Sequence, residues 1–515
     1  MEFNVIYWFT ALLPIALLLF LISYLEVSSR LAAGLSLILA CFLALTVFQV
    51  APYQLTISTG KGAVLSLYVI LIIIGAVLLY NIVETAGGFA SMKTYINGLG
   101  GDKTLKLLGL SWAFSGFIQG ITGFGVPVAI VGAMLTGIGY KPIIALITVL
   151  IGHSWAISFG SMGSSFYALQ LVTGLEALQL GTTMALLFFL PIFTTGIFTV
   201  HVYGGWQAVK NQFKYILSGG LAMGLTLWVA AFLGFPHIGS LLAGMTGSAL
   251  FLLLLLYHTG PEKAVDCDAS QVMPLKYALF PYLVLILSVL ITQVPPLAVF
   301  LPDWELAFSF PGYTTGLGFA VGAETNFSPI GFFTHPFFFL VLSAGVGLLL
   351  YRKTEFIDGE EIGMIFADSY RRASSSVLTV FLLMILASVM NDSGMVTIFA
   401  RGMGRLGRGI FPVLSPLIGI LGAFLTGSNT SSNVLFGAFQ VNTADLLDLS
   451  PHMIAAAQSI GGSLGSAVAP AKIIMGTAIV GLEGAEGNIV KKCLGYTLLS
   501  GILVGMAVLV LSQIF

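Results

Sequence analysis

Long apolar runs separated by short polar segments dominate the chain. A helix of about 20 residues rises ~30 Å, which matches the hydrocarbon thickness of a bilayer. The run that begins at residue 6 has no basic segment before it, so we expect a retained span and not a cleaved signal. We predict about twelve spanning helices, at 6–24, 32–50, 63–83, 142–168, 176–200, 214–234, 239–257, 276–293, 335–351, 373–390, 451–475 and 493–513.

Two further stretches do not fit a spanning helix. In 105–138 and in 410–447, apolar segments of about 13 to 16 residues flank a centre rich in Gly, Ser and Thr. A helix of that length reaches ~20 Å, about to the middle of the membrane. We interpret both stretches as re-entrant hairpins, since bare backbone at that depth is tolerated only inside protein or beside a wet cavity.

The composition is typical of a membrane protein and excludes other classes. Apolar residues make up 57% and charged residues 8% of the 515-residue chain, whose mean hydropathy is +1.02, whereas soluble proteins carry ~25% charged residues. The net charge of −1 offers no basic surface for nucleic acid. The sequence therefore predicts an all-α polytopic protein of the cell membrane, with the lipid bilayer as a partner and no nucleic-acid partner.

The two hairpin stretches belong to an internal repeat. Residues 117–120 (FIQG) align with 424–427 (FLTG), and the same offset of 307 takes Glu84 to Asn391. An odd number of spans separates the copies, so the second copy is inverted in the membrane. We divide the chain into a first repeat at 1–200 with hairpin 105–138, central helices and an extracellular segment at 201–334, and a second repeat at 335–515 with hairpin 410–447.

The positions of the lysine and arginine residues indicate how the predicted spans are oriented across the membrane. Segment 294–334 contains no Lys or Arg, so we place it outside. Most other basic residues then fall on the inner face, and both termini fall outside. Within the outer segment, residues 308–323 are a candidate for a small extracellular flap. The basic residues left outside are Lys61, Arg401, Arg405 and Arg408.

The hairpin centres carry polar groups that suit an anion. Each centre precedes a new helix, whose first N–H groups are free and whose dipole places partial positive charge there. Two such helix ends meeting at mid-membrane make a pocket for a carboxylate. The alternative is that these small residues only allow close helix packing. The candidate residues are Gln119, Gly120, Thr122, Gly123 and Gly125 in the first repeat and Ser428, Asn429, Thr430, Ser431 and Asn433 in the second.

Two spans contain a second pair of interruptions, at 152–163 and at 461–465. Unwound backbone there can bind a cation or a proton-carrying group. His153 lies deep in a span beside a break, and imidazole, with an ordinary pKa of ~6.5, suits protonation near neutral pH. The alternative is a ring satisfied by neighbouring backbone. We add four residues to the predicted substrate site: His153, Ser154, Gly462 and Ser463.

Three charged residues join His153 as candidates for proton coupling. Lys472 lies within an apolar span, where an ammonium is costly unless it is paired. It either meets the substrate carboxylate or a titrating acid, or its long side chain reaches the inner interface. Glu84 and Asp392 end equivalent spans of the two repeats, where they serve proton transfer or gating, or are simply solvated helix ends.

The chain contains no motif of an enzyme or a metal site. It lacks HExxH, GxSxG and the GxxxxGK[ST] nucleotide loop, and its three cysteines show no paired spacing. We therefore expect no cofactor, no bound metal and no catalytic activity. Transport would draw on an ion or substrate gradient and not on ATP.

The hairpin motifs resemble those of the lactate permease family. Residues 116–130 (GFIQGITGFGVPVAI) are similar to that family's hairpin signature, and 158–163 (SFGSMG) and 425–433 (LTGSNTSSN) match two further blocks. The resemblance implies secondary transport of L-lactate, D-lactate or glycolate, usually with a proton. It extends to a larger ion-transporter superfamily, whose paired hairpin tips hold a carboxylate and, in some members, sodium; this likeness allows a homodimer.

Gln119 departs from the family pattern. Many lactate permeases carry an acidic residue at this position, and an amide cannot replace it as a proton carrier. The resemblance therefore leaves proton carriage to His153 or Glu84.

The resulting hypothesis is a secondary-active transporter of a small monocarboxylate. It would work by proton symport and alternating access, with the anion between the hairpin tips. The alternative is a sodium-coupled carboxylate symporter. A passive anion channel is less favoured, because hairpins that end at mid-membrane leave no open pore. The absence of any catalytic motif in the sequence disfavours a membrane-embedded enzyme.

Overall fold

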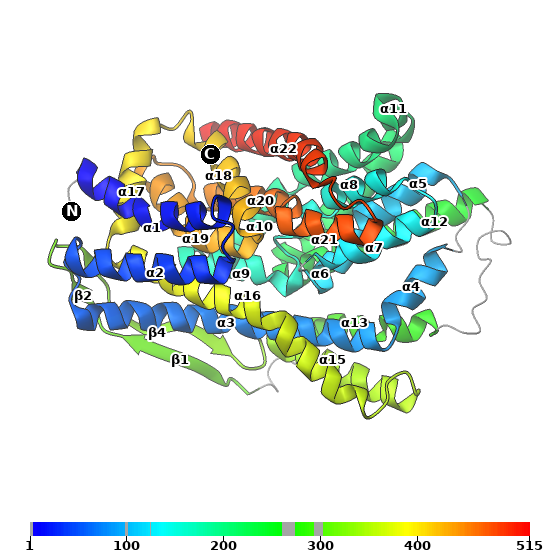
Figure 1. The fold of residues 1–515 in the computed structure, drawn as a ribbon, viewed down its shortest axis with the longest axis horizontal. Coiled ribbons are helices and arrows are strands. Elements are labelled where there is room, and N and C mark those ends of the chain that lie inside the picture. The colour runs from blue at the N-terminus through cyan, green and yellow to red at the C-terminus, as the bar shows by residue number, and fades with distance from the viewer. Residues whose placement is uncertain (1–3, 98–100, 124, 260–272, 293–301, 515) are drawn as a thin grey trace.

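The computed structural model of the chain is built of helices, with one small region of strands (Figure 1). It describes residues 4–97, 101–123, 125–259, 273–292 and 302–514. Long apolar segments form helices because a helix satisfies the backbone N–H and C=O groups within the segment itself.

The first half of the chain is helical throughout its described part. Its elements are α1 (Val5–Ser23), α2 (Ser29–Thr46), α3 (Pro52–Thr85), α4 (Gly88–Asn97), α5 (Lys103–Leu108), the π-helical η1 (Gly109–Phe114), α6 (Ser115–Ile121), α7 (Val126–Gly137), α8 (Pro142–Gly152), the short turns η2 (Ser154–Ala156) and η3 (Ser161–Gly163), α9 (Ser164–Thr173), α10 (Ala177–Leu187), α11 (Phe189–Phe232) and α12 (Pro236–Thr259).

The second half adds four strands. Its elements are α13 (Leu275–Thr292), β1 (Glu305–Phe310), β2 (Tyr313–Thr314), β3 (Ala320–Val321), β4 (Glu324–Gly331), α15 (Pro336–Lys353), α16 (Glu361–Asp392), α17 (Met395–Met403), η6 (Gly404–Leu406), α18 (Phe411–Thr426), α19 (Asn429–Leu446), α20 (Pro451–Ala467), α21 (Pro470–Val480) and α22 (Glu486–Ile514).

The helices are those of a polytopic membrane protein, as predicted. Among the described residues, ten helices are long and apolar enough to cross a membrane, or eleven if the bent pair Pro142–Ala156 and Ser161–Thr173 is counted as one span. The prediction of about twelve is higher because the runs 176–200 and 214–234 join in one 56-residue stretch, Ala177–Phe232.

That stretch folds back on itself within α11. The backbone is non-helical at Gly204 and Gly205. Beyond this turn, a Cβ added at Gly220 would meet the ring of Phe193 at 2.4 Å, and one at Gly224 would meet the ring of Phe189 at 2.6 Å. Since the later glycine faces the earlier phenylalanine, the two halves of α11 run antiparallel, as two separate spans would.

Helices α3 and α16 form a long antiparallel pair. A Cβ added at Gly62 of α3 would lie 2.5 Å from the Cα atom of Ile385 of α16, which shows how closely the backbones approach. Farther along, Asn81 Nδ2 donates a hydrogen bond to Ser369 Oγ at 2.8 Å. These helices occupy equivalent positions in the sequence repeat, and opposite directions are what an inverted repeat requires. The short helices that follow them, α4 and α17, lie at opposite ends of the molecule (Figure 1).

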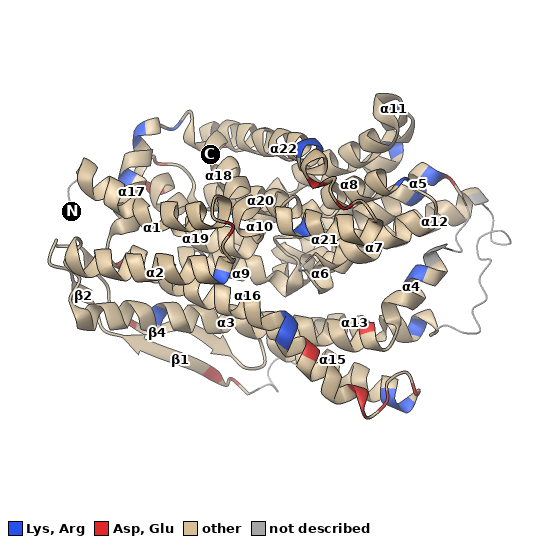
Figure 2. Ribbon diagram, viewed as in Figure 1, with Lys and Arg blue, Asp and Glu red and all other residues tan. Residues whose placement is uncertain are grey.

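Charged residues are unevenly distributed between those two ends. Lys and Arg gather mainly at the end that carries α4, α5 and the turn of α11, and fewer lie at the end with α17 (Figure 2). This arrangement follows the predicted sidedness, in which the α17 end faces outside. The orientation in the cell membrane stays a prediction.

The strands at 305–331 are an addition to the all-α prediction. β1 pairs antiparallel with β4, and β2 with β3. We call residues 305–331 the flap. It contacts α3: Tyr313 OH and Ser58 Oγ lie 2.7 Å apart, and Lys61 Nζ lies 2.9 Å from a carboxylate oxygen of Glu324. Of the predicted outer segment, 294–334, residues 294–301 lie outside the described residues.

Both predicted hairpins turn inside the protein. The first enters through α5, η1 and α6, which ends at Ile121, and continues as α7 from Val126; the second consists of α18, a turn at 427–428, and α19. Helix α7 packs beside α21, and α19 packs beside α9. Each hairpin therefore contacts the broken span of the other repeat.

One predicted break is wrong. The interruption between α8 and α9 is present, but residues 461–465 lie inside the continuous helix α20, and the break comes after Ala467. The glycines serve close packing instead: a Cβ at Gly461 would lie 1.9 Å from the carbonyl oxygen of Pro416, and one at Gly465 would lie 2.4 Å from that of Ile420. Glycines four residues apart share one helix face, which lets α18 approach.

Candidate substrate site

The two hairpin tips and the two broken spans surround one cavity of about 450 Å³. Hydroxyl and amide side chains form much of its wall, and Lys472 is the one ionisable side chain among its described lining residues. The first hairpin contributes Gln119, the first broken span Ser161, Ser164 and Ser165, the second hairpin residues 426–431, and the second broken span Ser466 and Lys472.

Helix N-termini converge on this cavity. α9, α19 and α21 begin at its wall, and α7 begins beside Lys472, because a Cβ at Gly125 would lie 3.6 Å from Lys472 Cγ. Gly125 precedes α7 with a φ of 83°, and Gly163 precedes α9 with a φ of 73°, a left-handed conformation that glycine adopts without strain. Ser428 caps α19 by accepting a hydrogen bond from the Ser431 N–H at 3.3 Å. Several positive dipole ends around one cavity favour an anion.

The tip of the second hairpin is held by the first repeat. Asn429 Nδ2 donates to Ser158 Oγ at 2.9 Å, and Ser158 Oγ lies 2.9 Å from Ser459 Oγ. One turn further along α19, Asn433 Nδ2 donates to the carbonyl oxygen of Ser165 at 2.9 Å and to Ser459 Oγ at 3.0 Å. These bonds fix the start of α19 against α9 and α20.

The tip of the first hairpin is closed against the first broken span. Gly123 has a φ of 65°, and a Cβ there would lie 1.8 Å from Ser161 Oγ, so a larger residue does not fit. Gly160 makes room for the amide of Gln119, since a Cβ at Gly160 would lie 2.9 Å from Gln119 Nε2. The neighbouring Phe124 lies outside the described residues.

Lys472 supplies the positive charge of the cavity. It lies in the first turn of α21, and its Nζ donates to Ser466 Oγ at 2.8 Å. The ion pairs found among the described residues do not include it. Because an ammonium inside a membrane protein is costly without a counter-charge, this arrangement suits a bound carboxylate.

Three buried amide oxygens in this region lack a hydrogen-bond partner within the described part of the chain: Gln119 Oε1, Asn429 Oδ1 and Asn433 Oδ1. A buried acceptor without a donor costs about 1–3 kcal/mol. A substrate hydroxyl, a water molecule or a cation would satisfy these oxygens. No group of three His, Cys, Asp or Glu side chains that could hold a metal ion occurs among the described residues.

Six predicted site residues pack around the tips and do not line the cavity: Gly120, Thr122, Gly123, Gly125, Asn433 and Gly462. Thr122 Oγ1 donates to the carbonyl oxygen of Ile118 at 2.9 Å, within its own helix turn. Gly120 faces α12, since a Cβ there would lie 2.5 Å from the backbone nitrogen of Leu241. Gly462 makes room for Asn429, whose Oδ1 would lie 2.0 Å from an added Cβ.

The other residues predicted from the two interruptions, His153, Ser154 and Ser463, lie behind the residues that line the cavity. His153 is fully buried at the end of α8; its Nδ1 lies 2.6 Å from the carbonyl oxygen of Val149, and its Nε2 has no partner among the described residues. Ser463 Oγ donates to the carbonyl oxygen of Ser154 at 2.6 Å, which joins the two broken spans. These residues support the cavity from outside its surface.

Glu84 and Asp392 lie at opposite ends of the α3–α16 pair, away from the cavity wall. Glu84 is exposed near the end of α3. Asp392 is buried, with Oδ2 3.8 Å from Lys61 Nζ, and Lys61 also reaches Glu324 of the flap. Asp392 thus belongs to an ion-pair cluster between the flap and the helix ends.

Sequence reasoning missed the wall that α2 and α16 provide. Ser29, Ser375, Ser376 and Thr379 line the cavity, although 373–390 was predicted as a plain apolar span. The available signal was the run of serines at 374–376, because successive hydroxyls in a spanning helix favour a partner or a wet cavity over lipid.

Broken helices around one polar cavity, within a bundle of apolar spans, define a multi-pass membrane transporter. The sequence profile of the L-lactate permease family matches residues 8–515. The chain therefore belongs to the L-lactate permease family, a multi-pass family of the cell membrane, and the resemblance predicted from the hairpin motifs is confirmed.

Curated relatives cover nearly the same length. The chain is 28% identical to a glycolate permease of Escherichia coli over 540 residues, which covers 98% of this chain and 95% of that protein. It is 29% identical to an L-lactate permease of Streptococcus iniae, covering 81% of this chain and 88% of the relative. It is 26% identical to an L-lactate permease of Bacillus subtilis, covering 98% and 96%.

The fold also resembles a solved structure. The YdaH transporter of Alcanivorax borkumensis superimposes with a TM-score of 0.51 at 15% identity, covering 93% of this chain and 97% of that one. This likeness concerns the fold alone.

Proposed function

We propose that the protein is a secondary-active transporter of a small 2-hydroxy monocarboxylate (L-lactate, D-lactate or glycolate), which binds between the two hairpin tips. The observation that carries the proposal is the convergence of helix N-termini and Lys472 on one cavity of about 450 Å³. The relatives named above as permeases for L-lactate and glycolate support this substrate class.

The wall offers partners for both ends of such an acid. The carboxylate would lie near Lys472 Nζ and the first N–H groups of α19 and α21, where charge and dipoles are favourable. The hydroxyl would donate to one of the unpartnered oxygens, Gln119 Oε1 or Asn429 Oδ1. Charge-assisted bonds at one end and a neutral bond at the other orient the substrate.

The same lysine supports a proposal of coupling to a proton. A carboxylate and a protonated Lys472 form a neutral pair, which crosses the membrane interior at lower cost than either charge alone. The empty site would return with Lys472 neutral, so that one proton moves with each anion. His153, Glu84 and Asp392 lie off the cavity and would act as relays between this site and the two membrane faces.

Uptake into proteoliposomes tests the proposal. Labelled L-lactate should accumulate when the outside is acidic and should not accumulate without a gradient. Asn429→Ala should abolish this uptake, because it removes a tip donor and its oxygen, and Gly363→Ala, where an added Cβ meets no atom within 4 Å, should leave it unchanged. Uptake that is linear in concentration and shows no counterflow would point to a passive channel instead.

A sodium-coupled mechanism is the second candidate. The three unpartnered oxygens of Gln119, Asn429 and Asn433 favour it, because amide oxygens are ligands for hard cations. Replacing sodium with choline at constant pH separates the two mechanisms. A fall in uptake with choline, together with indifference to the pH gradient, would replace proton coupling by sodium coupling.

A further inference from the structure

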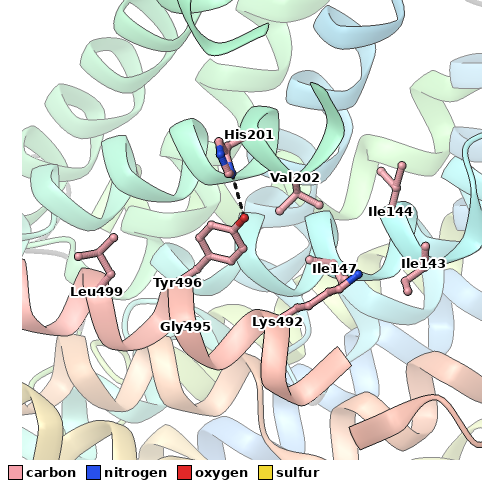
Figure 3. Close-up of a pocket in the computed structure, with 9 residues that line it drawn as sticks. All are labelled: Ile143, Ile144, Ile147, His201, Val202, Lys492, Gly495, Tyr496 and Leu499. Carbon is pink, nitrogen blue, oxygen red and sulfur yellow. Dashed lines mark hydrogen bonds between the residues drawn. The ribbon is translucent and has the colours of Figure 1, made fainter. Parts of the chain in front are cut away.

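A second cavity, of about 560 Å³, lies on the periphery of the molecule, apart from the substrate site. Figure 3 shows its lining side chains, which come from the start of α8, the first half of α11 and the start of α22. None of these side chains lines the cavity between the hairpin tips. The lining residues are Ile143, Ile144, Ile147, His201, Val202, Lys492, Gly495, Tyr496 and Leu499.

The lining is divided into a polar and an apolar part. His201 Nδ1 lies 2.9 Å from Tyr496 OH, and Lys492 lies one helix turn before Tyr496 on α22 (Figure 3). Isoleucines of α8 and Leu499 supply the apolar part. A site that pairs one cation and two hydrogen-bonding rings with an aliphatic surface fits an amphiphile whose head is anionic.

The charge of Lys492 is available to a ligand. The ion pairs among the described residues do not include it. The carboxylate of Glu486, at the start of the same helix, is engaged elsewhere, since its Oε1 accepts from Thr477 Oγ1 at 2.8 Å and from the Gly484 N–H at 3.1 Å. An anion entering the cavity would therefore meet an uncompensated ammonium.

The surroundings place the cavity at the level of lipid headgroups. His201 lies just before the turn of α11 at Gly204 and Gly205, and its ring lies 4.7 Å from the ring of Trp206, which is 61% exposed. Exposed tryptophan and tyrosine mark the membrane–water interface. The same end of the molecule carries most of the Lys and Arg residues, as the cytoplasmic face does in membrane proteins (Figure 2).

We infer that this cavity binds the headgroup of an anionic phospholipid of the inner leaflet. The phosphate contacts Lys492 and the His201–Tyr496 pair, and an acyl chain lies along Ile144 and Leu499. Basic pockets between spanning helices on the cytoplasmic side are suited to such headgroups.

Native mass spectrometry of the purified, delipidated protein tests this inference. The probes are phosphatidylglycerol, phosphatidylcholine with the same acyl chains, and inorganic phosphate. We expect retention of phosphatidylglycerol and little retention of phosphatidylcholine. Lys492→Gln should weaken phosphatidylglycerol binding about fivefold, the loss expected for one lysine near an anionic lipid. Lys491→Gln is the matched control, because it removes the same charge from the same turn but does not line the cavity.

A thermal-shift measurement identifies any variant that is not folded, and Leu499→Ser provides a second, uncharged variant that should also weaken binding of the long-chain lipid. Three results would overturn the inference: equal retention of phosphatidylcholine, equal loss in Lys491→Gln and Lys492→Gln, or stabilisation by inorganic phosphate that matches the effect of the lipid. The last result would identify a site for a free anion.

Discussion

Replacing Lys472 with methionine separates two effects of the lysine: its effect on the stability of the empty protein and its contribution to the binding of a carboxylic acid. Methionine keeps the aliphatic stem that lies beside Gly125 and removes the ammonium that donates to Ser466 Oγ at 2.8 Å. In the empty cavity an ammonium at Lys472 has no counter-ion among the described ion pairs, so the lysine either stays charged or releases its proton, and both cost free energy. Its replacement should therefore raise the thermal stability of the substrate-free protein.

The same substitution should weaken substrate binding. A hydrogen bond between an ammonium and a carboxylate contributes about 2 kcal/mol where both groups are partly shielded from water. At ~1.4 kcal/mol for each factor of ten, the dissociation constant of L-lactate should rise about 30-fold. Isothermal titration of the purified protein measures this constant, and a melting curve without substrate measures the stability.

Lys491→Met is the matched control, because it removes the same charge from an exposed position. It should change neither quantity. An unchanged dissociation constant in Lys472→Met would refute a direct contact between this lysine and the carboxylate. A fall in the stability of the empty protein would refute the view that the unpaired ammonium is a cost.

Three other substitutions test the packing and the ion pairs. Gly461→Ala places a Cβ within 1.9 Å of the carbonyl oxygen of Pro416, so we expect much less folded protein in a detergent size-exclusion assay. Lys61→Met removes the partner of Glu324, so the flap should be cut faster by a protease added from outside. Ser158→Ala deletes the acceptor of a buried amide, which costs about 1–3 kcal/mol, and should lower the melting temperature and weaken lactate binding together.

Each of these variants has its own control. Gly363→Ala is the control for Gly461→Ala, because a Cβ added at Gly363 meets no atom within 4 Å. If Gly461→Ala also folds normally, that result would contradict the close packing of α18 on α20. Lys353→Met removes a lysine at the far end of α15 and should leave cleavage of the flap unchanged. Equal cleavage in Lys61→Met and Lys353→Met would mean that the ion pair does not hold the flap. For Ser158→Ala, a lower melting temperature with unchanged lactate binding would show that the serine supports the fold alone.

Most of the helical framework could be predicted because membrane spans depend on one property, the length of an apolar run. The hairpins at 105–138 and 410–447 could be predicted for the same reason, since their apolar limbs are too short to cross. The number of spans was harder to fix, because the turn of α11 at Gly204 and Gly205 interrupts the backbone without a long polar loop. The strands of the flap carry no apolar run and were not predicted.

The break in the second repeat was misplaced for a physical reason. In the sequence alone, a helix interruption and a surface for close packing are equally compatible with Gly461, Gly462 and Gly465. Only the position of α18 distinguishes the two. The actual break, at 468–469, precedes Pro470, whose ring is compatible with the first turn of a helix. The cavity wall from α16 was missed because the placement of its serines beside the hairpin tips depends on contacts between segments far apart in the sequence.

The bonds that join the two broken spans also affect how the chain is made. Ser158 leaves the ribosome 301 residues before Ser459, the residue that its hydroxyl contacts. During that interval the nascent first half exposes unsatisfied hydroxyl and backbone groups at the level of the acyl chains, where they are costly. The insertion machinery must shelter them until α19 and α20 arrive. A product that stops before Phe411 should therefore be recognised and degraded by membrane proteases, however well its early helices have inserted.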